Sequence, residues 1–288
     1  MRLRKLSTAI ALLSVCLSAQ AATSALADNQ TNRIRVEYAP PANPAHQSIH
    51  DTLKDRKALE TLQQVFSPFK LPVDLTLRTV GCRGISNAWY QRPIVSVCYE
   101  YLDEILQNLP ATTTPAGITS ADAMLGQFFY VFAHEIGHAI FDLLDIPLFG
   151  GLEDSADQFA TYIMLQFGSD HARSLIGGAA YSYQSAIRNP SAPSLAAFSD
   201  IHSPPAQRFY NLLCIAYGSD TALFADLVQK GYLPEKRATD CKREYGEVAY
   251  AFYKLIVPHL DAPAAKQMLR SWPLGDKPRA VSDSGVPR

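Results

Sequence analysis

Residues 124–144 of the chain, MLGQFFYVFAHEIGHAIFDLL, contain an HEIGH pentapeptide at positions 134–138. On an α-helix, side chains four residues apart lie one above the other, so His134 and His138 can offer two imidazoles to one Zn²⁺. Glu135 is turned about 100° round the helix, where it can reach a water that the metal activates rather than the metal itself. Because such a pentapeptide occurs by chance in roughly one chain of this length in a hundred, its surroundings decide its meaning.

The polar side chains of this stretch share one face of the predicted helix. They fall within a sector about 100° wide and comprise Gln127, His134, Glu135, His138, Asp142 and Asp145. The rest of the surface is almost wholly Leu, Phe, Val, Ile and Ala, which is typical of a helix in a protein interior. One hypothesis is a buried helix whose histidines only make hydrogen bonds. Two histidines and a glutamate buried in register favour a metal site instead.

A catalytic zinc needs a third protein ligand, and the next predicted helix, residues 152–167, offers three carboxylates. Relative to the apolar face of that helix, Asp154 points almost directly away from the core. Glu153 lies at the edge of the apolar face, one turn from Asp157 on the same side. We therefore predict Glu153 as the third metal ligand and Asp157 as the acceptor that holds a ligating histidine by its other ring nitrogen.

Residues 1–27 have the features of a secretory signal: three basic residues near the N-terminus, an apolar run over 9–17, and small-residue cleavage sites after Ala21 or Ala27. The apolar run is too short to span a bilayer. We therefore predict an exported protein, periplasmic or secreted, with no membrane span in the mature chain. Loss of the three positive charges takes the formal net charge from −1 to −4, which gives no reason to expect nucleic acid as a partner.

The remaining chain of about 260 residues is long enough for one substantial core, and hydrophobic residues make up 48% of the full sequence. No internal repeat is visible. We predict one domain over residues 28–261. From residue 262 to 288, Pro, Gly and charged residues without periodicity predict a loosely held tail.

Four cysteines remain once Cys16 of the signal is set aside, an even number that suits an oxidising compartment. Three pairings are conceivable. Short loops cost the least entropy to close, which favours disulfides Cys82–Cys98 and Cys214–Cys241. A four-cysteine zinc site is disfavoured because no CxxC spacing is present.

Alternating and helical patterns divide the mature chain into a sheet-containing part and a helical part. Strands are predicted at 33–38 and 73–80, and a hairpin at 87–90 and 94–99. Helices are predicted at 50–66, 101–109, 120 to about 147, 152–167, 171–187, 223–228 and 244–256. If residues 94–99 formed the sheet edge, they could align an extended peptide by β-augmentation, although an ordinary core strand explains them equally well.

The combination of HEIGH, fourteen further residues and Glu153-Asp154-Ser155-Ala156-Asp157 resembles the HExxH plus ExxxD pattern of gluzincin metallopeptidases, of which thermolysin is the familiar example. More closely, the chain is similar to a bacterial family of exported metallopeptidases without an established substrate. The shared stretches are HEIGHAIFDLLDIPLFG, EDSADQFA, NAWY followed by CYE, and LLCIAYG. This similarity extends over most of the mature chain.

The resemblance implies that His134, His138 and Glu153 bind one Zn²⁺ and that Glu135 acts as general base. In the ExxAD group, which includes membrane-integrated CAAX-type peptidases, a later His and Arg six residues apart assist the transition state. His202 and Arg208 have this spacing, so the resemblance gives His202 a catalytic role and Arg208 a role toward substrate or transition state. The membrane-spanning helices of that group are missing here, and its specificity is not carried over.

Together these features predict an α+β, zincin-like domain with a small mixed sheet, an active-site helix and a mostly helical C-terminal half. The predicted activity is zinc-dependent hydrolysis of peptide bonds in a peptide or protein substrate. The alternatives are a catalytically silent zinc-containing binding or scaffold domain, and an amidase that acts on cell-wall peptides.

Overall fold

The computed structural model of the protein describes residues 32–183 and 198–268, so the predicted signal at 1–27 and most of the predicted tail lie outside the described residues. Its sheet has four strands in the order β1-β2-β4-β3. These are β1 (Ile34–Tyr38), β2 (Leu75–Val80), β3 (Ala88–Gln91) and β4 (Ile94–Cys98). The first, second and fourth strands run parallel, and β3 is antiparallel to β4. The predicted small mixed sheet and the α+β class are therefore confirmed.

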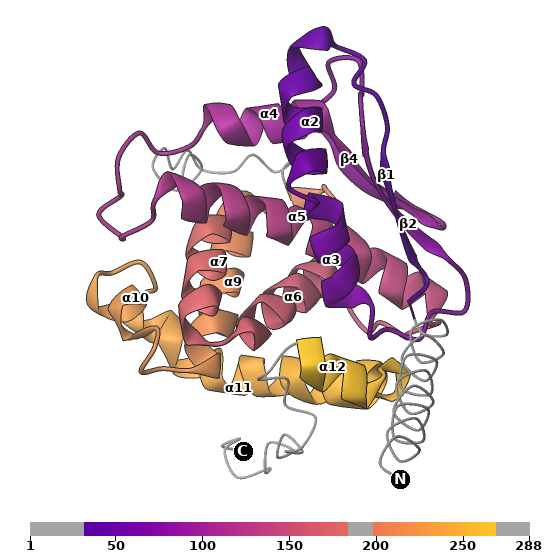
Figure 1. Cartoon of the computed structure of the whole chain (residues 1–288). Coiled ribbons are helices and arrows are strands. Elements are labelled where there is room, and N and C mark those ends of the chain that lie inside the picture. Colours follow the sequence, from indigo (N-terminus) through magenta and orange to yellow (C-terminus); the bar gives the residue numbers. More distant parts are fainter. Residues whose placement is uncertain (1–31, 184–197, 269–288) are drawn as a thin grey trace, which may run out of the picture. The chain divides into compact units, whose positions relative to one another are not determined.

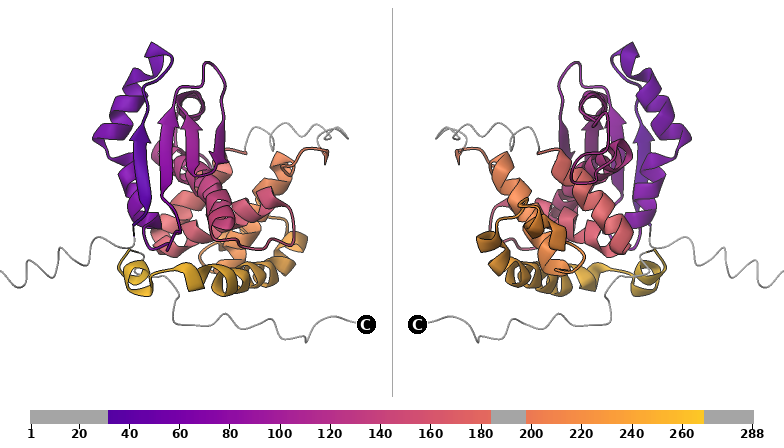
Figure 2. Two further views of the ribbon diagram at one scale, coloured as in Figure 1. Left: turned by 90° about the vertical axis from the view of Figure 1, so that its right-hand side faces the viewer. Right: turned by 90° about the vertical axis from the view of Figure 1, so that its left-hand side faces the viewer.

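Helices cover both faces of this sheet (Figures 1 and 2). Helix α3 (Ala58–Phe66) packs on one face, with α2 (Gln47–Asp55) before it, and α5 (Ser120–Leu143) packs on the other. A strand between two helical layers is apolar on both sides, as parallel strands usually are. In β4 the residues from Val95 to Cys98 are all buried, including Ser96.

The long helix α5 is the interior helix that the sequence predicts. It begins with a capping box, in which Thr119 and Asp122 each accept a hydrogen bond from the other's backbone N–H. Sixteen of its 24 residues are buried. It ends at Leu143, ahead of Pro147. Because most of the helix is buried, the face that carries the two histidines is held in one orientation.

Helix α7 (Ser169–Tyr181) crosses α5 at two glycines. A Cβ atom on Gly126 would lie 2.6 Å from the Cα of Gly178, so the backbones touch only because both residues lack side chains. This contact brings Tyr183, just beyond α7, beside Tyr130 of α5, with 3.1 Å between the two hydroxyl oxygens. The last residues of the helix predicted at 171–187 lie outside the described part of the chain.

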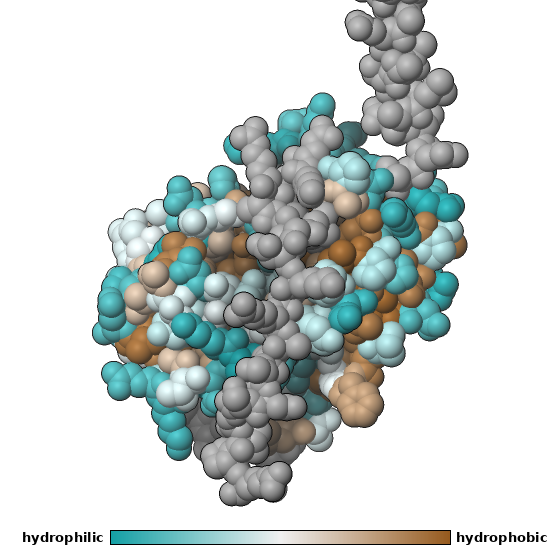
Figure 3. Space-filling view, turned by 90° about the horizontal axis from the view of Figure 1, so that it is seen from below, coloured by the Kyte–Doolittle hydropathy of each residue, from teal (hydrophilic) through white to brown (hydrophobic). Residues whose placement is uncertain are grey.

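The C-terminal half is helical, as predicted. It comprises α6 (Leu152–Met164), η2 (Leu165–Phe167), α7, α9 (Pro205–Ser219), α10 (Ala225–Gln229), α11 (Glu235–Ala251), the π-helix η4 (Phe252–Ile256), η5 (Val257–His259) and α12 (Ala262–Met268). Helices α9 and α12 occupy stretches for which the sequence pattern does not predict a helix. The face on which α11 and α12 lie mixes hydrophilic and apolar side chains (Figure 3).

Both predicted disulfides are present: Cys82–Cys98 ties the segment after β2 to the end of β4, and Cys214–Cys241 joins α9 to α11. Helix α4 (Tyr99–Gln107) follows β4 directly, and η1 (Pro44–His46) precedes α2. No helix among the described residues is long and apolar enough to cross a membrane.

The prediction of a single helix over 50–66 is wrong, because α2 ends at Asp55 and α3 begins at Ala58. Lys57 between them has a left-handed backbone with φ 51°. The hydroxyl of Tyr38 accepts a hydrogen bond from the backbone N–H of Leu59 at 2.9 Å and so caps α3 from the neighbouring strand. The break thus depends on a tertiary contact that the local sequence does not reveal.

The suggestion that residues 94–99 form the sheet edge is also wrong. Strand β4 lies between β2 and β3, and β3 is the edge strand. The alternative, a disulfide-anchored core strand, is the one observed. Any strand added to this side of the sheet would have to pair with β3.

Candidate metal centre

Three atoms with metal-binding lone pairs converge where α5 meets the first turn of α6. The Nε2 atoms of His134 and His138 are 3.1 Å apart. The Oε2 atom of Glu153 is 3.0 Å from the former and 3.3 Å from the latter. All three atoms therefore lie within 4.8 Å of one another, in a largely buried position. Helix periodicity brings the two histidines together, and the turn between α5 and α6 adds the carboxylate.

Asp154 points elsewhere, as the helical pattern predicts. Its Oδ1 accepts a hydrogen bond from the Ser203 hydroxyl at 2.8 Å, and it is not among the three convergent residues. The carboxylate of Glu153, by contrast, is only 8% exposed. The two adjacent acidic residues thus face different surroundings, and only Glu153 faces the histidines.

Asp157 forms the second layer of this cluster, one turn further along α6. Its carboxylate accepts hydrogen bonds from His134 Nδ1, from the Tyr130 hydroxyl and from two nitrogens of Arg208, each at 2.7 Å. The cation of Arg208 also lies over the ring of Tyr183, 5.6 Å from its centroid. Four donors fix one carboxylate, and that carboxylate in turn fixes the ring plane of His134.

The charges of the cluster are strongly coupled. Burial alone would lower the pKa of His134, but its hydrogen bonds to Asp157 and Glu153 outweigh burial and raise the pKa to about 9. The same contact with His134 holds the pKa of Glu153 down at about 2. Burial and the neighbouring His134 lower the pKa of His138, so its ring stays neutral. The carboxylates of Asp157 and Glu153 thus favour a positive charge at the centre of the three atoms, against the effect of burial.

Glu135 lies beside the cluster under the edge strand. It is 7% exposed, and burial raises the pKa of its carboxyl to about 6, while the nearby His134 and a hydrogen bond from the backbone of Tyr90 act in the opposite direction. Strand β3 is held over α5 by Asp142, which accepts hydrogen bonds from the Tyr90 hydroxyl at 2.6 Å and from Arg92 at 3.1 Å. The carboxyl of Glu135 therefore has a pKa suited to proton exchange near neutral pH.

The predicted pair His202 and Arg208 separates into two different environments. His202 is exposed at the rim, with its Nε2 3.0 Å from Glu153 Oε2 and its Nδ1 3.1 Å from Asp200. Arg208 is directed inward, and its guanidinium is paired with Asp157. The contacts of Arg208 make it a support for the cluster.

The donor set fits a divalent metal ion. Two neutral-capable imidazoles and one carboxylate are the ligands typical of a catalytic zinc with an open position. The Nδ1 atom of His138 is buried and has no hydrogen-bond partner within the described structure. The orientation of this ring therefore depends on the contacts of its Nε2 atom. A bound cation would take the place of the proton that His134 otherwise shares with Glu153.

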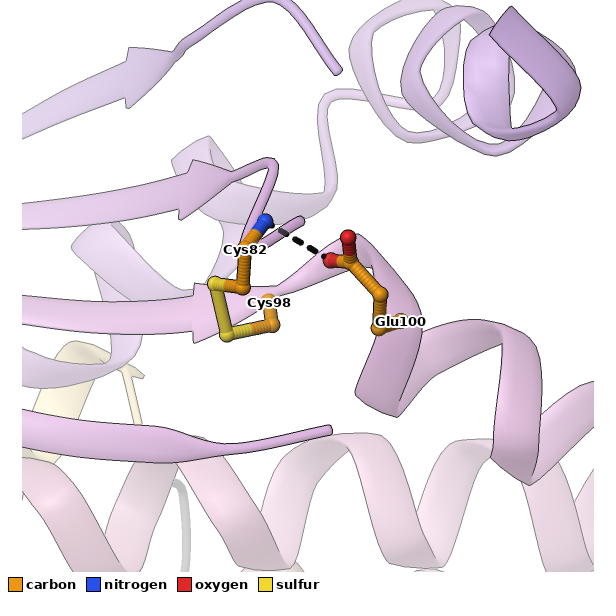
Figure 4. Close-up of side chains that lie close together, drawn as sticks. All are labelled: Cys82, Cys98 and Glu100. Carbon is orange, nitrogen blue, oxygen red and sulfur yellow. Dashed lines mark hydrogen bonds between the residues drawn. A yellow bond between two sulfur atoms is a disulfide. The ribbon is translucent and has the colours of Figure 1, made fainter. Parts of the chain in front are cut away.

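A second group of potential ligands lies at the end of the sheet: Cys82, Cys98 and Glu100 (Figure 4). Here the two sulfurs are joined in the disulfide. The carboxylate of Glu100 accepts hydrogen bonds from the backbone N–H groups of Cys82 at 2.9 Å and Gly84 at 3.0 Å, which lower its pKa against the opposing effect of burial. The atoms of this group are already committed to a structural role.

Several functional neighbours were not predicted from the sequence. Tyr130 could have been found, because it precedes His134 by four residues and so lies on the same face of α5. Tyr183 and the pairing of Asp142 with strand β3 arise from long-range packing and leave no local signal. Gln127, which shares the polar face, donates to the carbonyl of Ala123 within its own helix.

Fold and site together define an α+β protein with a buried His-His-Glu centre suited to a metal ion. A family model described as "Putative metallopeptidase" matches residues 38–256, which include every residue of the cluster. The chain therefore belongs to this metallopeptidase family. No curated protein and no solved structure matches the chain.

Proposed function

We propose that this protein is an exported, zinc-dependent peptidase of the gluzincin type. The observation that carries the proposal is the convergence of the ligand atoms of His134, His138 and Glu153 within 4.8 Å, with Glu135 buried beside them. Membership of the metallopeptidase family supports hydrolysis of peptide or protein substrates. Two disulfides suit an oxidising compartment and agree with export through a signal at residues 1–27.

Zinc is the proposed metal because a His₂Glu set with one open position is typical of catalytic zinc. When bound, the metal would polarise the scissile carbonyl and make a water molecule more acidic. His134, His138 and Glu153 would hold it. The pairing of His134 with Asp157 keeps the lone pair of Nε2 directed at the centre, because Nδ1 carries the proton that Asp157 accepts.

Glu135 is the proposed general base. Its raised pKa of about 6 lets its carboxylate accept a proton from the attacking water at neutral pH and release it to the departing amine. The backbone of Tyr90 donates to the carboxylate, so the edge strand sets where that carboxylate lies. Glu135 lies beside the cluster but is not one of the three convergent residues. Its carboxylate is therefore available to accept a proton, as a general base requires.

Residues outside the ligand set have proposed supporting roles. Asp157 orients His134, and Arg208 orients Asp157. His202 is proposed to donate a hydrogen bond to the oxyanion that forms at the carbonyl, since it lies at the rim within 3.0 Å of Glu153. The substrate is proposed to pair as an added strand with β3, the edge nearest α5.

The test is a digest of a broad peptide library by the purified full chain, loaded with zinc, with the products identified by mass spectrometry. Cleavage that is lost with a chelator and restored by zinc supports the proposal. A zinc-containing protein that cleaves neither library peptides nor cell-wall peptides would instead be a binding or scaffold domain. Cleavage restricted to cell-wall peptides would make it an amidase.

A further inference from the structure

Four large apolar side chains are exposed in the two short segments that lead into the metal centre. Leu152 and Phe149 lie one and four residues before Glu153, and they are 51% and 111% exposed. Ile201 and Phe198 lie one and four residues before His202, and they are 78% and 60% exposed. We call Phe149, Leu152, Phe198 and Ile201 the apolar rim.

The apolar rim is one feature and not two, because side-chain contacts join its segments. His202 Nε2 lies 3.0 Å from Glu153 Oε2, and the hydroxyl of Ser203 donates to Asp154 at 2.8 Å. Each contact links a residue one or two positions after Leu152 to a residue at the same spacing after Ile201. The two segments that carry the rim therefore adjoin at Glu153, one of the three convergent residues.

This degree of exposure is confined almost entirely to the rim. Among the described residues, five large apolar side chains are more than half exposed, and the fifth, Ile85, lies in the loop between β2 and β3. Isolated exposed apolar residues are ordinary, but a group beside a functional centre marks a binding surface. These side chains do not pack in the core, so their exposure does not contribute to the stability of the fold.

Charge around the rim indicates what kind of ligand it suits. Residues 145–155 and 198–204 include no Lys or Arg, and their acidic residues are Asp145, Glu153, Asp154 and Asp200. Among the described residues, Arg208 is the cation that contacts this cluster, and it is paired with Asp157. An anionic lipid surface or an acidic peptide would meet only carboxylates here, whereas an uncharged or basic peptide would not be repelled.

We propose that the apolar rim binds bulky apolar side chains within about four residues of the scissile bond of an extended, non-acidic peptide. This inference rests on the proposed peptidase function and adds the substrate class to it. Apolar contact with the rim removes exposed hydrocarbon from water on both partners, which favours such peptides over those with small or acidic residues. The rim residues determine specificity and take no part in the chemistry.

The first test compares matched peptides that carry Phe and Leu, or Ala and Gly, beside the cleaved bond. The wild-type, zinc-loaded chain should cleave the apolar peptide with the higher kcat/KM. Phe149→Ser and Ile201→Ser should each lower that value on the order of 10-fold and change cleavage of the Ala/Gly peptide much less. Ile85→Ser, which removes an exposed apolar side chain from the loop between β2 and β3, should change neither. Equal losses on both peptides, or a wild-type preference for small or acidic residues, would overturn the inference.

A second measurement separates this inference from the proposed hydrolysis. Binding of the same peptides to Glu135→Gln, followed by fluorescence anisotropy, needs no turnover. The apolar peptide should bind more tightly than the Ala/Gly peptide, and adding Ile201→Ser should remove the difference. If binding shows this pattern while the wild-type chain cleaves no peptide, the peptidase proposal fails and the rim stands. If cleavage occurs but rim variants leave both measurements unchanged, the rim proposal fails. Binding of uncharged lipid vesicles that is lost in Phe149→Ser, without peptide selectivity, would assign the rim to a membrane.

Discussion

Two clusters of the described residues consist of side chains that could bind a metal ion, yet their atoms are in different situations. At the junction of α5 and α6, the Nε2 atoms of His134 and His138 and the Oε2 atom of Glu153 lie 3.0–3.3 Å apart with no covalent bond between them. At the end of β4, the sulfurs of Cys82 and Cys98 are bonded, and Glu100 has backbone N–H donors of its own.

The difference teaches that proximity of ligand-type residues does not define a metal site. A site needs lone pairs that the protein leaves without protons or partners and directs at one point. The first cluster meets this condition once a metal displaces the inner proton of His134, because Asp157 accepts the outward proton of that ring and His138 stays neutral. The second cluster fails it, since each atom already has a partner. Variants in the two clusters should therefore separate chemistry from stability.

The largest effect is expected for Glu135→Gln. An amide cannot accept the proton of the attacking water, although its shape is nearly that of the carboxylate, so kcat should fall about 10²–10⁴-fold while fold and metal content persist. Steady-state kinetics with metal analysis of the same preparation checks this. A variant with near-normal turnover would remove Glu135 from the mechanism.

His202→Ala should follow, with a loss of about 10²-fold in kcat, because one donor to the developing oxyanion disappears. Metal content should remain normal, since His202 is not among the three convergent residues. His50→Ala is a matched control, as it removes a histidine that hydrogen-bonds to Asp51 on α2. Unchanged catalytic efficiency in His202→Ala would leave this residue without a role in the reaction.

The second cluster is tested by replacing Cys82 and Cys98 together with Ser. Loss of a disulfide that closes a loop of this size should lower the free energy of unfolding by about 3 kcal/mol. Zinc content per folded molecule should not change, because these sulfurs bind no metal. Denaturant unfolding and metal analysis give the two values. Loss of one equivalent of zinc in the double variant would show that the contrast between the clusters is false.

The smallest effect is expected for the stability of the metal-free protein as the pH changes. The pKa of His134 is raised to about 9 in the folded chain, so its stabilising contribution is complete below its ordinary pKa of about 6.5 and is lost as the pH rises toward 9. The pKa of Glu153 is lowered to about 2, so its contribution is present above about pH 4.5 and is lost in stronger acid.

With a chelator present, Tm should therefore fall by several degrees between pH 6.5 and 9. In zinc this fall should be absent, because metal ligation requires the histidines to be deprotonated. Thermal unfolding across this range, with and without zinc, provides the comparison. A metal-free protein whose Tm rises with pH in this window would contradict the account of His134.

The sequence predicts those parts of the fold that depend on local pattern. Helix periodicity and burial locate α5, and alternation locates β1, β2 and the hairpin. The break at Lys57 depends on the hydroxyl of Tyr38, and the order of strands depends on long-range pairing. Neither has a signature in neighbouring residues, which is why one helix was predicted for two and β4 was suggested as an edge.

The features of the site also divide into those that follow from local pattern and those that follow from long-range packing. Positions four apart on one helix, and the apolar face of the next, are enough to bring His134, His138 and Glu153 together and to turn Asp154 aside. The inward direction of Arg208 follows from the packing of α9 against α6, and the participation of Tyr183 follows from the packing of α7 against α5, which no single segment determines.

The most direct test of the central claim is zinc affinity, measured by competition with a chelator, for three neighbouring variants on α6. Glu153→Ala should lose most affinity, because it removes a ligand. Asp157→Ala should lose about 10–100-fold, because it frees the ring of His134. Asp154→Ala should bind zinc like the wild-type chain, because its carboxylate faces Ser203. Zinc lost from Asp154→Ala but retained by Glu153→Ala would contradict the assignment of the metal centre.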